Sequence, residues 1–179
     1  MQQMFSGTSS LTNIDGASNW DTSKATNMSG MFYNASSLTG IDGASGWDTS
    51  EVTTMASMFR GASSLANIDG ASNWDTSKVT AMYYMFRGTK ITNIDALSNW
   101  NTSKVDSMYY MFSGASSLTN IDGASNWDTS KVADMQSMFR NCSSITSLNP
   151  IFDWDVTSLT NKNTMFDGIP SSVARPGWY

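Results

Sequence analysis

The sequence predicts an α/β repeat solenoid, a stack of about 27-residue coils made of short strands and short helical turns. A fixed period of this size indicates small units that bury their apolar faces only by stacking on one another. Two residue series carry the prediction. Tryptophan recurs at Trp20, Trp47, Trp74, Trp100, Trp127 and Trp154. Met-Phe pairs recur at steps of 27, 27, 27, 26, 27 and 27 residues, at Met4-Phe5, Met31-Phe32, Met58-Phe59, Met85-Phe86, Met111-Phe112, Met138-Phe139 and Met165-Phe166.

The period divides the chain into one long array and a short tail. Residues 1–168 are expected to form a solenoid of six to seven repeats, and residues 169–179 a C-terminal capping tail. The tail carries Pro170, Pro176 and Trp178, and proline cannot donate to a hydrogen-bonded ladder. The N-terminal coil has no evident cap, so an edge-to-edge dimer through that coil is expected.

The first part of each repeat is a Leu-x-x-Ile-Asp segment, as in Leu38, Ile41 and Asp42. Branched apolar residues bounded by Gly, Asn and Ser are typical of a brief strand. Such a short strand is stable only between identical strands, which the period supplies. The sequence therefore predicts a ladder of these segments.

The second part is a Trp-Asp-Thr-Ser turn. Asp side chains commonly accept a backbone N–H two residues ahead and so close an Asx turn. The acidic position becomes Asn101 in one repeat, which favours a turn over a role that depends on charge. The other members are Asp21, Asp48, Asp75, Asp128 and Asp155.

The third part reads Val-Thr-x-Met-x-x-Met-Phe and predicts a strand that enters a short helical turn. The residue two after each Phe is always Gly or Asn, the two residues that enter the left-handed conformation most easily. We therefore expect the helical turn to end at Gly7, Asn34, Gly61, Gly88, Gly114, Asn141 and Gly168.

Composition argues against several classes of function. Charged residues make up 14% of the chain and the net charge is −5, so nucleic acid is not an expected partner. Histidine is absent, and Cys142 occupies a position that is Ala in other repeats. We expect no enzymatic activity, no metal and no cofactor. No stretch approaches the roughly 20 apolar residues that span a bilayer, so no membrane insertion is expected.

Four series of equivalent residues are candidates for functional features. The Met-Phe and Trp rows are predicted to pack in the interior. An aspartate row could bridge calcium, although solvated side chains are the better interpretation: Asp15, Asp42, Asp69, Asp95 and Asp122. A threonine row could bind ice, although turn capping is favoured: Thr22, Thr49, Thr76, Thr102 and Thr129.

The repeats resemble the BspA type of bacterial leucine-rich-repeat surface proteins. The resemblance is carried by Trp127-Asp128-Thr129-Ser130-Lys131-Val132 and by Met138-Phe139-Arg140-Asn141-Cys142-Ser143-Ser144. It covers nearly the whole chain and implies a right-handed leucine-rich-repeat-like solenoid with two ladders. It also implies a secreted or cell-surface protein that acts in adhesion.

The positions that vary between repeats indicate where a ligand would bind. The two residues between the Met residues of a repeat are Tyr-Tyr in two adjacent repeats, and Arg follows Phe in neighbouring repeats. Tyr and Arg are favoured contact residues at recognition surfaces. The predicted ligand-binding residues are Tyr83, Tyr84, Tyr109, Tyr110, Arg60 and Arg87. The expected partner is a host or neighbouring-cell protein or glycan, and the alternative is a structural spacer in a larger surface protein.

Overall fold

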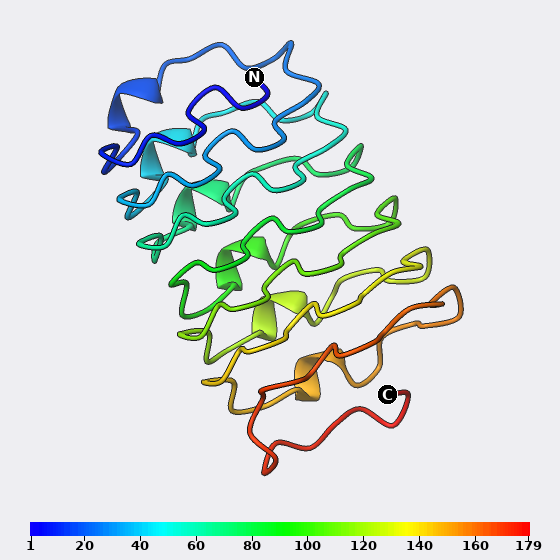
Figure 1. Cartoon of the computed structure of the whole chain (residues 1–179). Coiled ribbons are helices and arrows are strands. Elements are labelled where there is room, and N and C mark those ends of the chain that lie inside the picture. The colour runs from blue at the N-terminus through cyan, green and yellow to red at the C-terminus, as the bar shows by residue number, and fades with distance from the viewer.

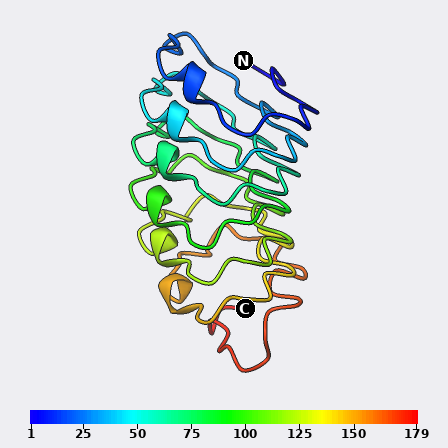
Figure 2. The ribbon, with the colours of Figure 1, turned by 90° about the vertical axis from the view of Figure 1, so that its left-hand side faces the viewer.

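The computed structural model describes all residues from 1 to 179. It is a stack of similar coils along one axis, with the two termini at opposite ends (Figures 1 and 2). We number the coils 1 to 7 by the Met-Phe pair that each contains. Short 3-10 helices form a column along one side of the stack (Figure 2): η1 (Asp15–Ala17), η2 (Asp42–Ala44), η3 (Asp69–Ala71), η4 (Asp95–Leu97), η5 (Asp122–Ala124) and η6 (Asn149–Ile151). The predicted repeat fold is thus confirmed. None of these helices has the length and apolar character needed to cross a membrane.

The secondary structure within a coil differs from the prediction. The structure contains no α-helix and no extended strand. Parallel pairing is limited to isolated bridges, which join Asn27 to Thr54, Thr54 to Ala81, Ala81 to Ser107, Ser107 to Asp134, Asp134 to Asn161, and Gly40 to Asn67. The strand predicted at Leu-x-x-Ile and the helical turn predicted at Met-x-x-Met-Phe are therefore wrong. The helical turn lies instead at the Asp-Gly-Ala segment that follows Ile.

Left-handed residues explain why the Met-Phe segment is not helical. Each coil has two residues with positive φ, four positions apart, such as Ser57 at 57° and Gly61 at 74°. In the same coil, the N–H of Met58 donates to the carbonyl of Met55, and that of Ala62 to the carbonyl of Phe59. Each turn has its positive φ at the third residue, as in a type II turn. The chain therefore makes two tight turns here in place of a helical one.

The left-handed position two after Phe was predicted in all seven coils, and the structure confirms every one. The other left-handed position was not predicted. It is occupied by Gly in coil 2 alone, and in the remaining coils by Gln3, Ser57, Tyr84, Tyr110, Ser137 and Thr164.

The left-handed residues also connect the coils. In coil 3, the N–H groups of Ser57, Phe59 and Gly61 donate to carbonyls of coil 4 over 2.9, 2.9 and 2.8 Å. The equivalent three bonds recur at all six junctions between coils. N–H groups at the intervening positions donate within their own turns. Because cross-coil bonds alternate with turn bonds, the coils are held in register although no regular strand forms.

The interior is filled by the Met-Phe and Trp rows, as predicted. Phe59 is fully buried, and its ring stacks on those of Phe32 and Phe86 at centroid distances of 5.5 and 5.6 Å. Trp47 is buried as well, and its indole N–H donates to the carbonyl of Ala17 in the preceding coil over 3.0 Å. The indole thus adds a directional cross-coil bond to its apolar packing.

The two ends of the stack differ. At the C-terminal end, Trp178 stacks on Trp154 at 6.4 Å and donates to the carbonyl of Ile151. At the N-terminal end, Trp20 is 37% exposed and Met4 is 52% exposed. Association through the N-terminal coil stays a prediction.

The Trp-Asp-Thr-Ser segments form the predicted Asx turns. Oδ1 of Asp48 accepts the N–H of Ser50 over 3.0 Å, and Oδ1 of Asn101 accepts that of Ser103 over the same distance. The interpretation that the turn does not require a charge is therefore confirmed at Asn101.

The threonine and aspartate rows both take part in contacts between coils. The threonine row is only 1–2% exposed, and Oγ1 of Thr49 donates to the carbonyl of Asp75 in the next coil. This row therefore cannot present a surface to ice. In the aspartate row, Asp42 accepts hydrogen bonds from the amide of Asn67, and no three acidic or cysteine side chains of the chain are grouped as metal ligands.

Two substitutions in coil 3 test the left-handed geometry with opposite signs. Ser57→Gly is expected to stabilise the protein by about 0.5 kcal/mol, because glycine removes a left-handed strain of about 1–2 kcal/mol at some cost in backbone entropy. Gly61→Ala is expected to destabilise it by about 1–2 kcal/mol, since the new Cβ would lie 2.1 Å from Oδ1 of Asn34. Urea unfolding of both variants measures the difference. A loss of stability in Ser57→Gly would contradict the backbone described above.

The Asx turns predict a loss of stability in acid. Hydrogen bonds from the Ser50 hydroxyl and N–H hold the pKa of Asp48 below its usual value, and the pKa is lowered in the same way at Asp21, Asp75, Asp128 and Asp155. A depressed pKa contributes stability above the unfolded value of about 3.9, and this contribution is lost as the pH falls through the folded value. A variant with Asn at all five positions should lose less stability than the wild type between about pH 5 and pH 3. Equal losses in urea unfolding at the two pH values would contradict this role.

Candidate binding surface

The paired tyrosines occupy two slots between the Met residues of coils 4 and 5. The Met residues on either side are buried in the core, whereas the four tyrosines between them are only half-buried. The first slot holds Tyr83 and then Tyr109, whose rings stack at 4.8 Å with planes 14° apart. The second slot holds Tyr84 and then Tyr110, whose rings stack at 5.1 Å. Tyr84 also meets Tyr109 edge-on at 4.8 Å. The four rings thus form one continuous cluster, as the coil register requires.

Two arginines extend this cluster along the neighbouring row. The guanidinium of Arg60 lies 4.5 Å from the ring centroid of Tyr84 and 5.5 Å from that of Tyr33. The guanidinium of Arg87 lies 5.5 Å from the centroids of both Tyr84 and Tyr110. Cations and rings therefore alternate in the order Tyr33, Arg60, Tyr84, Arg87 and Tyr110. Each cation–π contact contributes about 0.5–1 kcal/mol at exposed sites.

The arginines have no acidic partner. The single ion pair of the structure joins Lys78 to Glu51, with Nζ 2.6 Å from Oε1. The guanidinium groups of Arg60 and Arg87 donate no hydrogen bond, whereas that of Arg175 donates to backbone carbonyls in the C-terminal tail. The aromatic contacts hold both guanidinium groups in place while their N–H groups stay free to bind a ligand.

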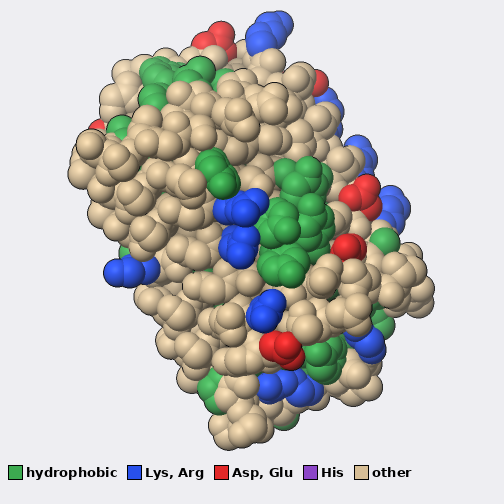
Figure 3. Space-filling model, viewed as in Figure 1, with side chains coloured by type: hydrophobic (Ala, Val, Ile, Leu, Met, Phe, Trp, Pro, Cys, Tyr) green, Lys and Arg blue, Asp and Glu red, His purple; other side chains and the backbone are tan.

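The hydroxyl of Tyr109 stays protonated at physiological pH. Burial, together with the neighbouring Tyr84 and Tyr83, raises the pKa of Tyr109 above its ordinary value. The phenol therefore keeps its proton and can act as a hydrogen-bond donor or acceptor. On the space-filling surface, a patch of hydrophobic side chains lies beside Lys and Arg side chains near the middle of one face (Figure 3).

We call the six predicted residues Tyr83, Tyr84, Tyr109, Tyr110, Arg60 and Arg87 the tyrosine–arginine strip. The structure brings all six together on one face through the contacts described above. Tyr33 was not among the predicted residues, although its ring contacts Arg60. Its place directly after Phe32, in the same row as Arg60 and Arg87, is the signal in the sequence that identifies it.

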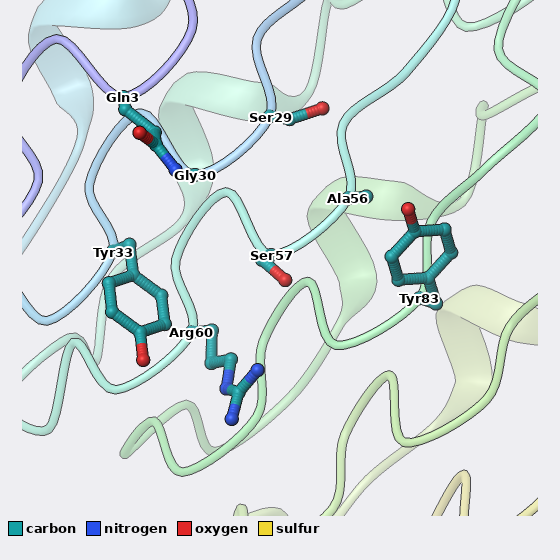
Figure 4. A pocket seen from close by; sticks show the side chains of 8 residues that line it. All are labelled: Gln3, Ser29, Gly30, Tyr33, Ala56, Ser57, Arg60 and Tyr83. Atoms are coloured by element: carbon teal, nitrogen blue, oxygen red, sulfur yellow. The ribbon is translucent and has the colours of Figure 1, made fainter.

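Two shallow grooves border the strip. The first groove has a volume of about 290 Å³, and Tyr33 and Arg60 line it on one side and Tyr83 on the other (Figure 4). Its other lining residues are Gln3, Ser29, Gly30, Ala56 and Ser57. A second groove, of about 300 Å³, continues past Arg60 to Arg87. Tyr33 and Arg60 belong to both, so the grooves adjoin.

The backbone at Tyr84 and Tyr110 is left-handed. Both residues have positive φ, at 59° and 56°, a conformation that is uncommon and unfavourable for bulky side chains. The equivalent residue of coil 2 is Gly30, which adopts this conformation freely. Two tyrosines therefore stand where the backbone favours glycine, and strain of this kind is frequent at functional sites.

Comparison with known families identifies one match. The family described as "Mycoplasma protein of unknown function, DUF285" matches residues 1–96 and again residues 64–175. The two overlapping matches together cover nearly the whole chain, in keeping with its repeats. Neither a curated protein nor a solved structure shows a significant match. The chain therefore belongs to the DUF285 family of repeat proteins.

Proposed function

We propose that this chain is an extracellular binding module that adheres to a protein or glycan partner through the tyrosine–arginine strip. The observation that carries the proposal is the pair of guanidinium groups that lie between half-buried tyrosine rings and have no acidic partner. Tyr and Arg are enriched among the residues that dominate binding energy. Rings stacked on one another lose little conformational freedom on binding, which favours affinity.

The large side chains at the left-handed positions of Tyr84 and Tyr110 support the same proposal. The left-handed φ alone does not call for tyrosine, because the same position holds Ser57, Ser137 and Thr164 in other coils. Contact with a binding partner would account for the tyrosine rings at these two positions. A spacer role within a larger surface protein is the alternative, and it leaves the position of these rings unexplained.

The proposed location and the finer fold rest on the resemblance between these repeats and the BspA type. We propose that the stack is a divergent leucine-rich-repeat solenoid, secreted or held on a bacterial cell surface. The Trp-Asp-Thr-Ser and Met-Phe motifs support that assignment, as does the one-per-coil turn of η1 to η6.

The experiment compares the wild type with a variant in which Tyr83, Tyr84, Tyr109 and Tyr110 are all Ser. Serine already occupies equivalent positions at Ser29, Ser57 and Ser137, so the variant is expected to fold. Both proteins are applied to an array of host extracellular proteins and glycans. For any partner of the wild type, the variant should lose at least about tenfold in affinity, or about 1.4 kcal/mol.

Thermal unfolding controls for the fold, and a Lys104→Ser, Lys131→Ser variant controls for exposed substitutions elsewhere on the stack. If the tyrosine variant bound every partner as well as the wild type does, the strip would not be the contact surface. If the wild type bound nothing, the spacer role would be favoured.

A further inference from the structure

We propose that the groove between Tyr83 and Arg60 binds a sugar ring that carries an acidic group, as part of an acidic glycan. This inference deepens the proposed function, because it names the ligand class of one part of the strip. The binding residues are Gln3, Ser29, Tyr33, Ser57, Arg60 and Tyr83.

One face of the Tyr83 ring is left uncovered. Tyr109 stacks against the other face, from the coil on the C-terminal side. On the N-terminal side, the same slot holds Ala56 and then Ser29, which are too small to cover a ring. Both residues line the groove together with Tyr83 (Figure 4). The groove is therefore the space that a tyrosine would fill if the row of rings continued by one coil.

The volume and walls of the groove suit a single sugar ring. About 290 Å³ lies at the lower end of the range for small-ligand sites. An aromatic ring face packs against the C–H groups of a sugar, while hydroxyl and amide groups bind its hydroxyls. The hydroxyl of Ser57 and the amide of Gln3 are placed around the groove for the second role (Figure 4). The hydroxyl of Ser29 lines the groove as well, and it also shares a hydrogen bond with Oγ1 of Thr54 over 3.2 Å.

The charge of the groove indicates an acidic sugar. Arg60 is the one charged residue among those that line it, and its guanidinium has no carboxylate partner. Guanidinium groups form charge-assisted hydrogen bonds with carboxylates and sulfates, often in pairs. Arg87 lines the adjoining groove, so a second acidic group of the same chain could bind there. A nucleic acid is a poorer fit, because the protein has a net charge of −5 and few clustered cations.

The decisive variant is Ala56→Tyr, which would place a ring over the free face of Tyr83. Tyrosine is accommodated in this slot in coils 4 and 5, so folding is expected to persist. Gln136→Tyr is the matched control, since it extends the same row at the opposite end, beyond Tyr109. Arg60→Met removes the cation and leaves the groove open.

The probe is tri-galacturonic acid, whose affinity for the protein is measured by calorimetry. Its uncharged methyl ester is the matched ligand without acidic groups, and inorganic phosphate and adenosine monophosphate are tested as other anions. We expect the wild type to bind the acid at millimolar concentration or better. Ala56→Tyr and Arg60→Met should each weaken binding at least about tenfold, and the methyl ester should bind at least about tenfold more weakly. Gln136→Tyr should match the wild type.

Three results would overturn the inference: no binding of the acid to the wild type at about 10 mM, no effect of Ala56→Tyr, or equal affinity for the methyl ester. Binding of phosphate or the nucleotide as tightly as the acid, with the same sensitivity to Ala56→Tyr, would identify a general anion site instead. Ala56→Tyr leaves all six residues of the strip in place. Failure of the glycan inference therefore leaves the tyrosine-to-serine test of the proposed function intact.

Discussion

The fold depends on hydrogen bonds that left-handed residues donate from one coil to the next. A positive φ turns the N–H of Ser57 and of Gly61 toward the carbonyls of coil 4, and the N–H of Phe59 between them makes a third bond in the same direction. Without these bonds, the short turns of each coil would have no regular partner, since no strand or α-helix supports them. The buried Phe and Trp rows add apolar stabilisation, but the direction of the N–H groups sets which residues become neighbours.

The register of the coils determines which variable residues become neighbours on the surface. Because equivalent residues of adjacent coils lie side by side, the tyrosine pairs of two coils become one cluster of four rings. The same register places Arg60 and Arg87 one coil apart, each against Tyr84. It also opens a groove where the large Tyr83 follows the small Ala56 one coil earlier. A coil stack can thus acquire a binding surface through substitutions that leave the core unchanged.

Much of this arrangement could be predicted from the sequence because it repeats. The period predicted the stack, the Gly and Asn positions predicted one left-handed residue per coil, and Asn101 predicted Asx turns. The Tyr and Arg residues of the strip followed from the same register. Side-chain hydrogen bonds between coils were harder to predict. The sequence suggests a turn cap at Thr49, whereas its buried hydroxyl donates to the carbonyl of Asp75 in the next coil.

The second left-handed position could not be predicted, because Ser57, Tyr84 and Thr164 give no local signal for positive φ. Their conformation follows from the cross-coil bonds, which are tertiary. The helical turn was predicted wrongly for the same reason. The Met-x-x-Met spacing fits a helix as well as it fits the two turns, and the cross-coil bonds that favour the turns are tertiary. The groove depends on the difference in size between equivalent residues one coil apart, such as Ala56 and Tyr83. The sequence of one repeat taken alone does not contain that difference.

Coil register can be measured directly by disulfide formation between engineered cysteines. The N–H of Thr80 donates to the carbonyl of Thr53 over 2.9 Å, and both side chains are exposed. Thr53→Cys with Thr80→Cys should therefore cross-link on mild oxidation, since adjacent coils lie within the Cα separation of about 4.4–6.8 Å that disulfides require. Thr53→Cys with Asp106→Cys spans two coils, about 10 Å, and should not cross-link. The native Cys142 will not interfere, because burial raises its pKa to about 12. Failure of the first pair, or equal cross-linking of the second, would contradict the register on which the fold and the binding surface both depend.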